Sequence, residues 1–175
     1  MSALPYDSSA AVNFSDLLER ALHVWDQRQV DDGVFALALP LQGLDPLLQL
    51  SDLEDADPFR FLWDGAPGLS FAAAGRCHHL ELSGPKRFEL AQRFSDITLG
   101  RILDGSPEAP AQARSRILLA FSFFESTGEL QPKGSMPSVQ AVLPRWQLSR
   151  HGRQGWLRLH GVAQQTGDVL SLIHI

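Results

Sequence analysis

The residues best suited to chemistry are the consecutive Cys77, His78 and His79, because cysteine and histidine are common zinc ligands. Successive residues of an extended strand point to opposite faces, so Cys77, His79 and Glu81 would share one face. At about 3.3 Å per residue, Cys77 and Glu81 lie about 13 Å apart, too far to complete one zinc shell. The spacing therefore favours an ordinary strand surface, and we predict no metal-ligating residue here.

Other candidate residues form no recognisable catalytic motif. His151 and His160 fall on a predicted turn and strand, and neither is accompanied by a nucleophile elbow or a carboxylate partner motif. The glycines are dispersed and match neither a phosphate-binding loop nor a dinucleotide-binding fingerprint. Trp63, Trp146 and Trp156 fall on predicted strands, which favours sheet packing over a ligand platform. We therefore predict no catalytic, cofactor-binding or metal-binding residue in this chain.

The composition is that of one globular domain. The chain has 175 residues, of which 44% are hydrophobic and 20% are charged, enough to bury a substantial core. A single cysteine excludes an internal disulfide and fits a reducing compartment, so we expect the cytoplasm. No apolar run approaches the roughly 20 residues that cross a bilayer, and the first residues lack the features of a signal peptide. We expect no membrane partner.

Charge is distributed unevenly along the chain. The net charge is −5, but residues 112–175 contain seven arginines and lysines and only three acids. These basic residues are scattered over predicted strands and form neither a clustered stripe nor a pattern interleaved with aromatic residues. The pattern favours a solvated sheet surface, and we predict no nucleic-acid partner.

Hydrophobic periodicity and turn residues predict an α+β fold, an antiparallel β-sheet with helices packed on it. The most apolar segment, 116–125, is expected to be a strand buried on both faces and to organise the domain, with 138–148 as its partner. In chain order, the expected elements are a helix at Phe14–Val30, a strand at Val34–Leu39, a short helix from Pro46, strands at Phe59–Trp63, Leu69–Gly75 and Arg76–Leu82, a helix at Pro85–Asp104, a strand at Ile117–Phe124, and a hairpin of Ser138–Arg150 with Gly155–Gln164.

The order of five short segments resembles the N-terminal portion of isochorismate synthases, most closely the cyanobacterial type. The resemblance covers roughly residues 34–160 and depends on the order of the segments, since each of them is modest alone. The segments are Phe59–Trp63 (FRFLW), Phe71–Gly75 (FAAAG), Leu80–Phe94, which contains an Arg-Phe pair, Ile117–Phe124 (ILLAFSFF) and Ala141–Leu148 (AVLPRWQL).

This resemblance implies the N-terminal part of the chorismate-utilising enzyme fold. Such enzymes bind chorismate with Mg²⁺, and an isochorismate synthase uses a lysine-activated water and a glutamate that assists departure of the hydroxyl. The isomerase reaction feeds menaquinone, phylloquinone or salicylate synthesis. By the resemblance, the lysine, the glutamate and the metal ligands all follow a hairpin like 138–164, in the C-terminal portion. We therefore expect this chain to be inactive, to hold no cofactor and to self-associate through exposed sheet edges.

The C-terminal end carries a separate expectation. Leu170–Ile175 (LSLIHI) resembles a translated sequencing-adapter end, and we predict that it is a non-native tail. Residues 1–169 would then be the incomplete N-terminal portion of one chorismate-utilising domain. The alternative is that LSLIHI is one more β-strand, which its apolar and β-branched residues would suit.

Two other functions are compatible with the sequence. One is a complete small α+β module that binds a partner through its sheet and catalyses nothing. The other is the N-terminal part of a different chorismate enzyme, such as anthranilate or salicylate synthase. Anthranilate synthase is disfavoured because its Leu-Leu-Glu-Ser type feedback motif is matched only partially, by Asp52-Leu53-Glu54.

Overall fold

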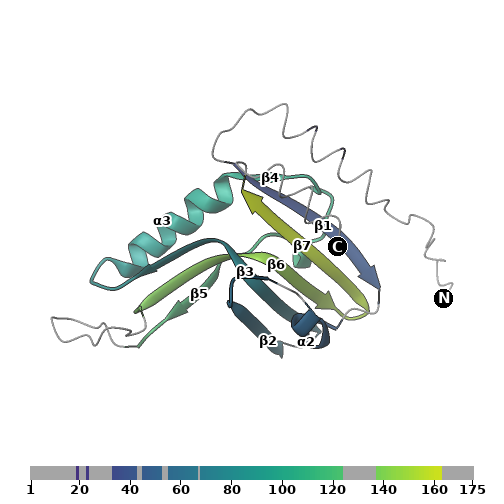
Figure 1. Ribbon diagram of the computed structural model, residues 1–175, viewed down its shortest axis with the longest axis horizontal. Helices are drawn as coiled ribbons and strands as arrows, with labels where there is room; N and C mark the ends of the chain where they lie inside the picture. Colours follow the sequence, from purple (N-terminus) through teal and green to yellow (C-terminus); the bar gives the residue numbers. More distant parts are fainter. Residues whose placement is uncertain are drawn as a thin grey trace, which may run out of the picture.

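The computed structural model describes residues 19, 23, 33–42, 45–52, 55–66, 68–123 and 137–162. Within them the chain forms seven strands, two α-helices and two short 3₁₀ helices, labelled as in Figure 1. Their bounds are β1 Val34–Gln42, α2 Pro46–Gln49, η1 Leu50–Asp52, β2 Arg60–Ala66, β3 Leu69–Leu82, α3 Arg87–Gly100, β4 Ile102–Asp104, η2 Ala111–Ala113, β5 Leu118–Phe121, β6 Val139–His151 and β7 Gln154–Val162.

All seven strands belong to one sheet, which confirms the predicted α+β class. The strand order is β2-β3-β6-β7-β1-β4, and β5 pairs with β6 beside this path. Every pair is antiparallel except β1–β4, so the sheet is mixed rather than purely antiparallel. The parallel pair forms because the chain leaving α3 runs along β1, where Val34 N donates to Arg101 O and Gly105 N donates to Ala36 O.

Strand β6 is the centre of the sheet. One of its edges pairs with β3 along the full length of β6, as the two long strands in Figure 1 show. The other edge is divided, because β5 pairs with residues 139–142 and β7 pairs with residues 146–151. Pro144 lies in the gap between these two partners. A proline is tolerated in a central strand here because neither β5 nor β7 takes a hydrogen bond from this position.

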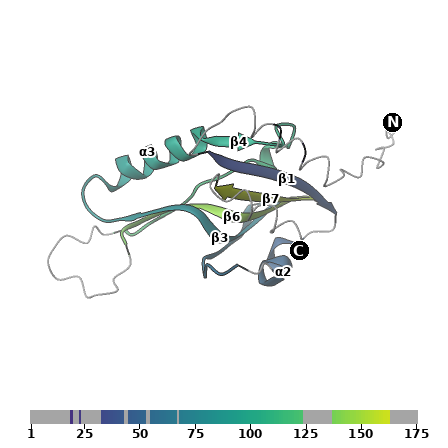
Figure 2. The same ribbon diagram turned by 45° about the horizontal axis from the view of Figure 1, so that its top comes forward.

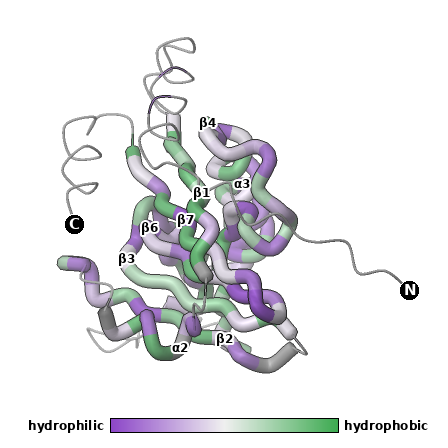
Figure 3. Tube along the Cα trace, turned by 90° about the vertical axis from the view of Figure 1, so that its right-hand side faces the viewer, coloured by the Kyte–Doolittle hydropathy of each residue, from purple (hydrophilic) through white to green (hydrophobic). Residues whose placement is uncertain are grey.

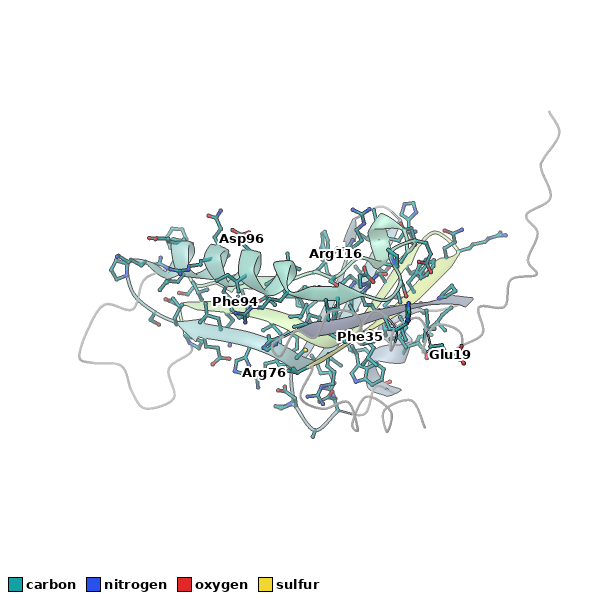
Figure 4. All side chains as sticks on the ribbon, turned by 90° about the horizontal axis from the view of Figure 1, so that it is seen from above. Glu19, Phe35, Arg76, Phe94, Asp96 and Arg116 are labelled. Atoms are coloured by element: carbon teal, nitrogen blue, oxygen red, sulfur yellow. The ribbon has the colours of Figure 1, made fainter. Side chains whose placement is uncertain are left out.

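The sheet separates two layers. Figure 2 shows α3 on one side of the sheet and α2 on the other, and we call these sides the α3 face and the α2 face. In Figure 4, Arg116 lies on the α3 face and Arg76 on the α2 face, while Phe94 of α3 points toward the sheet and Asp96 away from it. Because the chain covers both faces, the strands in the middle of the sheet are largely apolar, as Figure 3 shows for β1.

Each face has its own apolar core. On the α2 face, Leu50 packs against a cluster of Ala72, Ala74, Trp146, Leu148 and Leu159. On the α3 face, Trp156 packs against a cluster of Ala38, Ala109 and Ala113, next to η2. The predicted sheet packing of Trp146 and Trp156 is thus confirmed, whereas Trp63 on the edge strand β2 is half exposed.

Strand β3 is one continuous element where two strands were predicted. Gly75 was expected to separate them, but it lies in an irregular part of the strand, next to a register shift between Arg76 and His78. Its φ of +64° is one that residues with a side chain rarely adopt. A Cβ at this position would also lie 2.3 Å from Asp55 Oδ2. Glycine is therefore required for the chain to pass Asp55 without breaking the strand.

The predicted helix at 85–104 is shorter in the structure, because residues 102–104 form β4. Of its apolar residues, Ala91 is buried, whereas Phe88, Ile97 and Leu99 are exposed. The helix covers the sheet with a stripe that contains the buried residues Arg87, Ala91 and Thr98, together with Phe94, which points toward the sheet. Apolar composition could not identify this stripe, since the apolar residues Phe88, Leu90, Ile97 and Leu99 lie outside it and are exposed.

The segment at 117–124 was predicted to be the buried organising strand, and this is wrong. Strand β5 is only four residues long, it lies at an edge among the described residues, and Leu119 and Phe121 are exposed. Its predicted partnership with β6 is confirmed. The apolar side chains Leu119 and Phe121 therefore lie on an exposed face of an edge strand, and they do not mark the centre of the sheet.

The strand predicted at Val34–Leu39 forms, but it is longer than predicted and ends at Gln42. Strand β1 continues past Pro40 because, among the described residues, β4 pairs with β1 only as far as Ala36, so no described strand needs the N–H that Pro40 lacks. The hairpin of β6 and β7 forms as predicted. The predicted helix at 14–30 and the tail at 170–175 lie outside the described residues, apart from Glu19 and His23, which are helical. No described helix is long and apolar enough to cross a bilayer.

Candidate functional site

The three residues that opened the sequence analysis do not converge in the structure. Cys77 lies at the irregular part of β3, where burial raises the pKa of its thiol to about 12. His78 lies opposite Leu143 of β6, and burial, followed by the charge of Arg101, lowers its pKa. His79 is exposed. Among the described residues, no group of three or more histidines, cysteines or acids is placed to hold a metal ion.

The acids near this strand are engaged in ion pairs. Burial opposes ionisation of Asp57, but the hydrogen bond and charge of Arg76 outweigh it and lower the pKa of Asp57. Arg76 Nη1 also lies 3.2 Å from Glu81. The buried carboxylate of Asp55 lies 3.6 Å from Arg145 Nε. Each of these carboxylates has an arginine as its partner, so they do not form an oxygen cage for a divalent cation.

The most unusual chemistry lies on the α3 face, where polar side chains are buried under the segment that contains η2. We call Ser115, Arg116, Gln147, Arg158 and His160 the polar core. Gln147 and Arg158 are directly opposed on β6 and β7, and His160 follows two residues later on the same face. Burying these groups is costly unless they are fully hydrogen-bonded, so their partners decide what they do.

Gln147 fastens residues 111–116, which we call the cover segment, to the sheet. Its Nε2 donates to Arg114 O at 2.8 Å, and its Oε1 accepts from Arg116 N at 3.2 Å. The Arg116 guanidinium then donates to Gln112 O at 2.7 Å and stands 5.5 Å from the centre of the Phe71 ring. The cover segment is therefore attached to β6 by the two hydrogen bonds of Gln147 and to β3 by the contact of Arg116 with Phe71.

Arg158 makes the second attachment. Its side chain is only 1% exposed, and its Nε donates to Ala113 O at 2.5 Å. Its Nη1 lies 3.1 Å from Asp104 Oδ1 and 3.3 Å from Ser115 Oγ. Asp104 thus compensates a charge that would otherwise be too costly to bury, and the pair links β4, β7 and the cover segment.

His160 connects the cover segment to the gap in β6. Its Nδ1 lies 2.7 Å from Pro144 O, and its Nε2 lies 2.8 Å from Ser115 Oγ. A carbonyl can only accept, so Nδ1 carries the proton and the Ser115 hydroxyl donates to Nε2. Burial, followed by the charge of Arg158, lowers the pKa of His160 to about 3. The imidazole is therefore neutral at physiological pH.

The Ser115–His160 pair has the spacing of a nucleophile and its general base, but not the acid–base properties. A base with a pKa of about 3 is almost wholly unprotonated at neutral pH and a weak proton acceptor. His160 is also completely buried, so no substrate reaches its ring. The pair stabilises the fold. Sequence reasoning missed it because 45 residues separate the partners, and no local motif relates them.

The Pro-Arg-Trp sequence of β6 is explained by the same contacts. Pro144 supplies the carbonyl that accepts from His160, and Arg145 pairs with Asp55 across the sheet. Trp146 packs in the α2-face core. All three residues therefore have structural roles.

Comparison with known proteins identifies the origin of this scaffold. A family model described as chorismate binding enzyme matches residues 17–175. The chain belongs to the chorismate-binding enzyme family. In this family member, the seven-stranded mixed sheet and its helix are consistent with a fragment of a chorismate-binding domain. Searches of curated proteins and of solved structures find no match.

The neutral state of His160 predicts a specific loss of stability in acid. Between the ordinary pKa of 6.5 and the folded value of about 3, the unfolded chain binds a proton and the folded chain does not. The free energy of unfolding should therefore fall by about 1.4 kcal/mol per pH unit as the pH decreases through this window, and this cost should be absent above it.

Urea unfolding of the wild type and of His160→Asn at several pH values measures this effect. The asparagine amide can donate to Pro144 O from the position of Nδ1 and does not titrate, so the slope should become smaller. The same substitution at the exposed His79 is the control and should keep the wild-type slope. Equal slopes for the wild type and His160→Asn would contradict the prediction.

Proposed function

We propose that this chain is the N-terminal scaffold of an isochorismate synthase, whose complete domain converts chorismate to isochorismate with Mg²⁺. The observation that carries the proposal is the family match over residues 17–175, together with the order of the five segments that resemble isochorismate synthases. We place the parent enzyme in the cytoplasm, in menaquinone or phylloquinone synthesis.

The arrangement of the five segments supports this proposal. Phe59–Trp63 and Phe71–Gly75 pair through β2 and β3. Within the Ile117–Phe124 segment, Leu118 and Leu119 of β5 pair with Val142 and Ala141 at the start of the Ala141–Leu148 segment. Leu80–Phe94 connects the end of β3 to α3. The segments thus build neighbouring parts of one sheet and its helix, as expected of a shared scaffold.

The reaction requires groups that the described residues do not supply. Water must lose a proton as it attacks one ring carbon, and the departing hydroxyl must gain a proton at another. The described acids near β3 are paired with arginines and do not fit Mg²⁺, and His160 is buried and weakly basic. We place the lysine base, the glutamate acid and the Mg²⁺ ligands in the part of the parent enzyme downstream of this chain.

An assay of chorismate turnover tests the assignment. Purified 1–175 with chorismate and Mg²⁺ should form no isochorismate, because it lacks the proposed base, acid and metal ligands. The product of the uninterrupted reading frame, extended downstream, should form isochorismate, detected by chromatography of the reaction mixture.

Isochorismate formed by 1–175 alone would overturn the inactive-scaffold proposal. Anthranilate or salicylate as the product of the extended protein would assign it to another chorismate enzyme. The absence of any chorismate turnover by the extended protein would favour a binding module.

We also propose that two copies of this chain associate through the outer edge of β5. The edge strand β2 carries Arg60 and Asp64 and has a register shift, and β4 is only three residues long. Charges, irregularities and shortness all discourage pairing at a sheet edge. Strand β5 has no charge, proline or irregularity and pairs only with β6 among the described strands.

The surface beside this edge favours a second copy as the occupant. Leu119 is 47% exposed, Phe121 is 44% exposed and Phe88 of α3 is 53% exposed. The rings of Phe88 and Phe121 are 5.1 Å apart, so they form one apolar surface on the α3 face. An antiparallel pair of β5 strands would continue the sheet across a twofold axis and place both apolar surfaces on the same side.

Light scattering as a function of protein concentration tests this interface. The wild type should form dimers, and Leu119→Lys should shift the chain to monomers because it places a charge beside the edge. Leu48→Lys alters another exposed leucine, on α2, and should leave the dimer intact. A wild type that stays monomeric, or a Leu119→Lys variant that dimerises like the wild type, would contradict the proposal.

A further inference from the structure

Three buried polar atoms on the α3 face have no hydrogen-bond partner: Ser149 Oγ, Trp156 Nε1 and Arg158 Nη2. Ser149 of β6 is directly opposite Trp156 of β7, and Arg158 follows two residues later on the same face. The side chains of Ser149 and Arg158 are each 1% exposed. Neighbouring sites across a strand pair lie about 5 Å apart, so these three groups belong to one small region of the sheet.

The surroundings of this region are formed by the sheet and the cover segment. Phe71 is opposite Ser149 on the other neighbouring strand, β3, and Arg116 of the cover segment stands over the Phe71 ring. Ala113, which accepts from Arg158 Nε, packs in the same cluster as Trp156. The cover segment therefore closes the region from solvent while leaving the three polar atoms unpaired.

The hydrogen-bonding chemistry of these atoms is one-sided. An indole N–H and a guanidinium N–H can only donate, and the hydroxyl of Ser149 can donate as well. An unpaired buried donor costs about 1–3 kcal/mol, more if it is charged, so three together need an explanation. One group that accepts hydrogen bonds from all of them would satisfy all three.

The local charge favours a negatively charged acceptor. Two guanidinium groups, those of Arg116 and Arg158, have printed contacts in this region, and Asp104 is the acid paired with Arg158. Asp104 is paired with Nη1 of Arg158 and not with the unpaired Nη2. The pKa values of His160 and Arg116 are both lowered. Burial is the larger cause in each case, and the positive charge of Arg158 is the second.

We propose that Ser149, Trp156 and Arg158 form a binding site for one small monovalent anion of halide size. The anion would accept from Arg158 Nη2, the Trp156 indole N–H and the Ser149 hydroxyl, and would join the cover segment to β6 and β7 through Arg158. The site is independent of the proposed function. Its role is to stabilise the closed cover segment.

Thermal unfolding in sodium bromide tests the site. With the ionic strength held constant by sodium gluconate, whose anion is too large to enter, bromide should raise the melting temperature of the wild type with a saturable dependence. Ser149→Ala and Trp156→Phe each remove one donor and keep the remaining packing, and both should lose the saturable rise. Trp146→Phe removes the other unpaired buried indole N–H, on the opposite face, and should keep it.

Anomalous scattering from bromide-soaked wild-type crystals gives an answer even if a variant fails to fold. A bromide peak within hydrogen-bonding distance of Arg158 Nη2 is expected. The proposal would be overturned by a wild type whose melting temperature does not respond to bromide, by a response that both variants retain, or by a difference map with no peak at this position.

Discussion

The structure depends on how the divided edge of β6 is completed. Strands β5 and β7 each pair with only part of this edge, and Pro144 lies between them. The Pro144 carbonyl in this gap is satisfied by a side chain, His160 Nδ1, in place of a strand. A buried carbonyl without a donor would be costly, so the sheet can branch here only because a neutral histidine is held in position by Ser115.

The same region explains why polar residues are buried on the α3 face of the sheet. Gln147, Arg158 and His160 each connect a strand to the cover segment or to β6. Replacing such a network with apolar residues can be neutral or stabilising in other proteins, so stability alone does not explain it. Its directional bonds fix where the cover segment lies, which apolar packing would specify less strictly.

Sequence reasoning succeeded where local periodicity decides structure. It predicted the α+β class, the β6–β7 hairpin and the pairing of β2 with the first half of β3. It failed where tertiary contacts decide. Residues 102–104 form β4 only because β1 lies beside them, and β5 is apolar without being central. The contact of His160 with Pro144 and Ser115 could not be predicted, because no local pattern relates them.

The protonation of His160 is the most direct test of the account, since the branch in the sheet requires a neutral ring with its proton on Nδ1. Nitrogen-15 NMR of the imidazole reports both the tautomer and the pKa. We expect the Nδ1–H tautomer throughout the range between the ordinary pKa of 6.5 and the folded value of about 3. Titration of His160 near 6.5, or a proton on Nε2 in the folded protein, would contradict the proposed role of this contact.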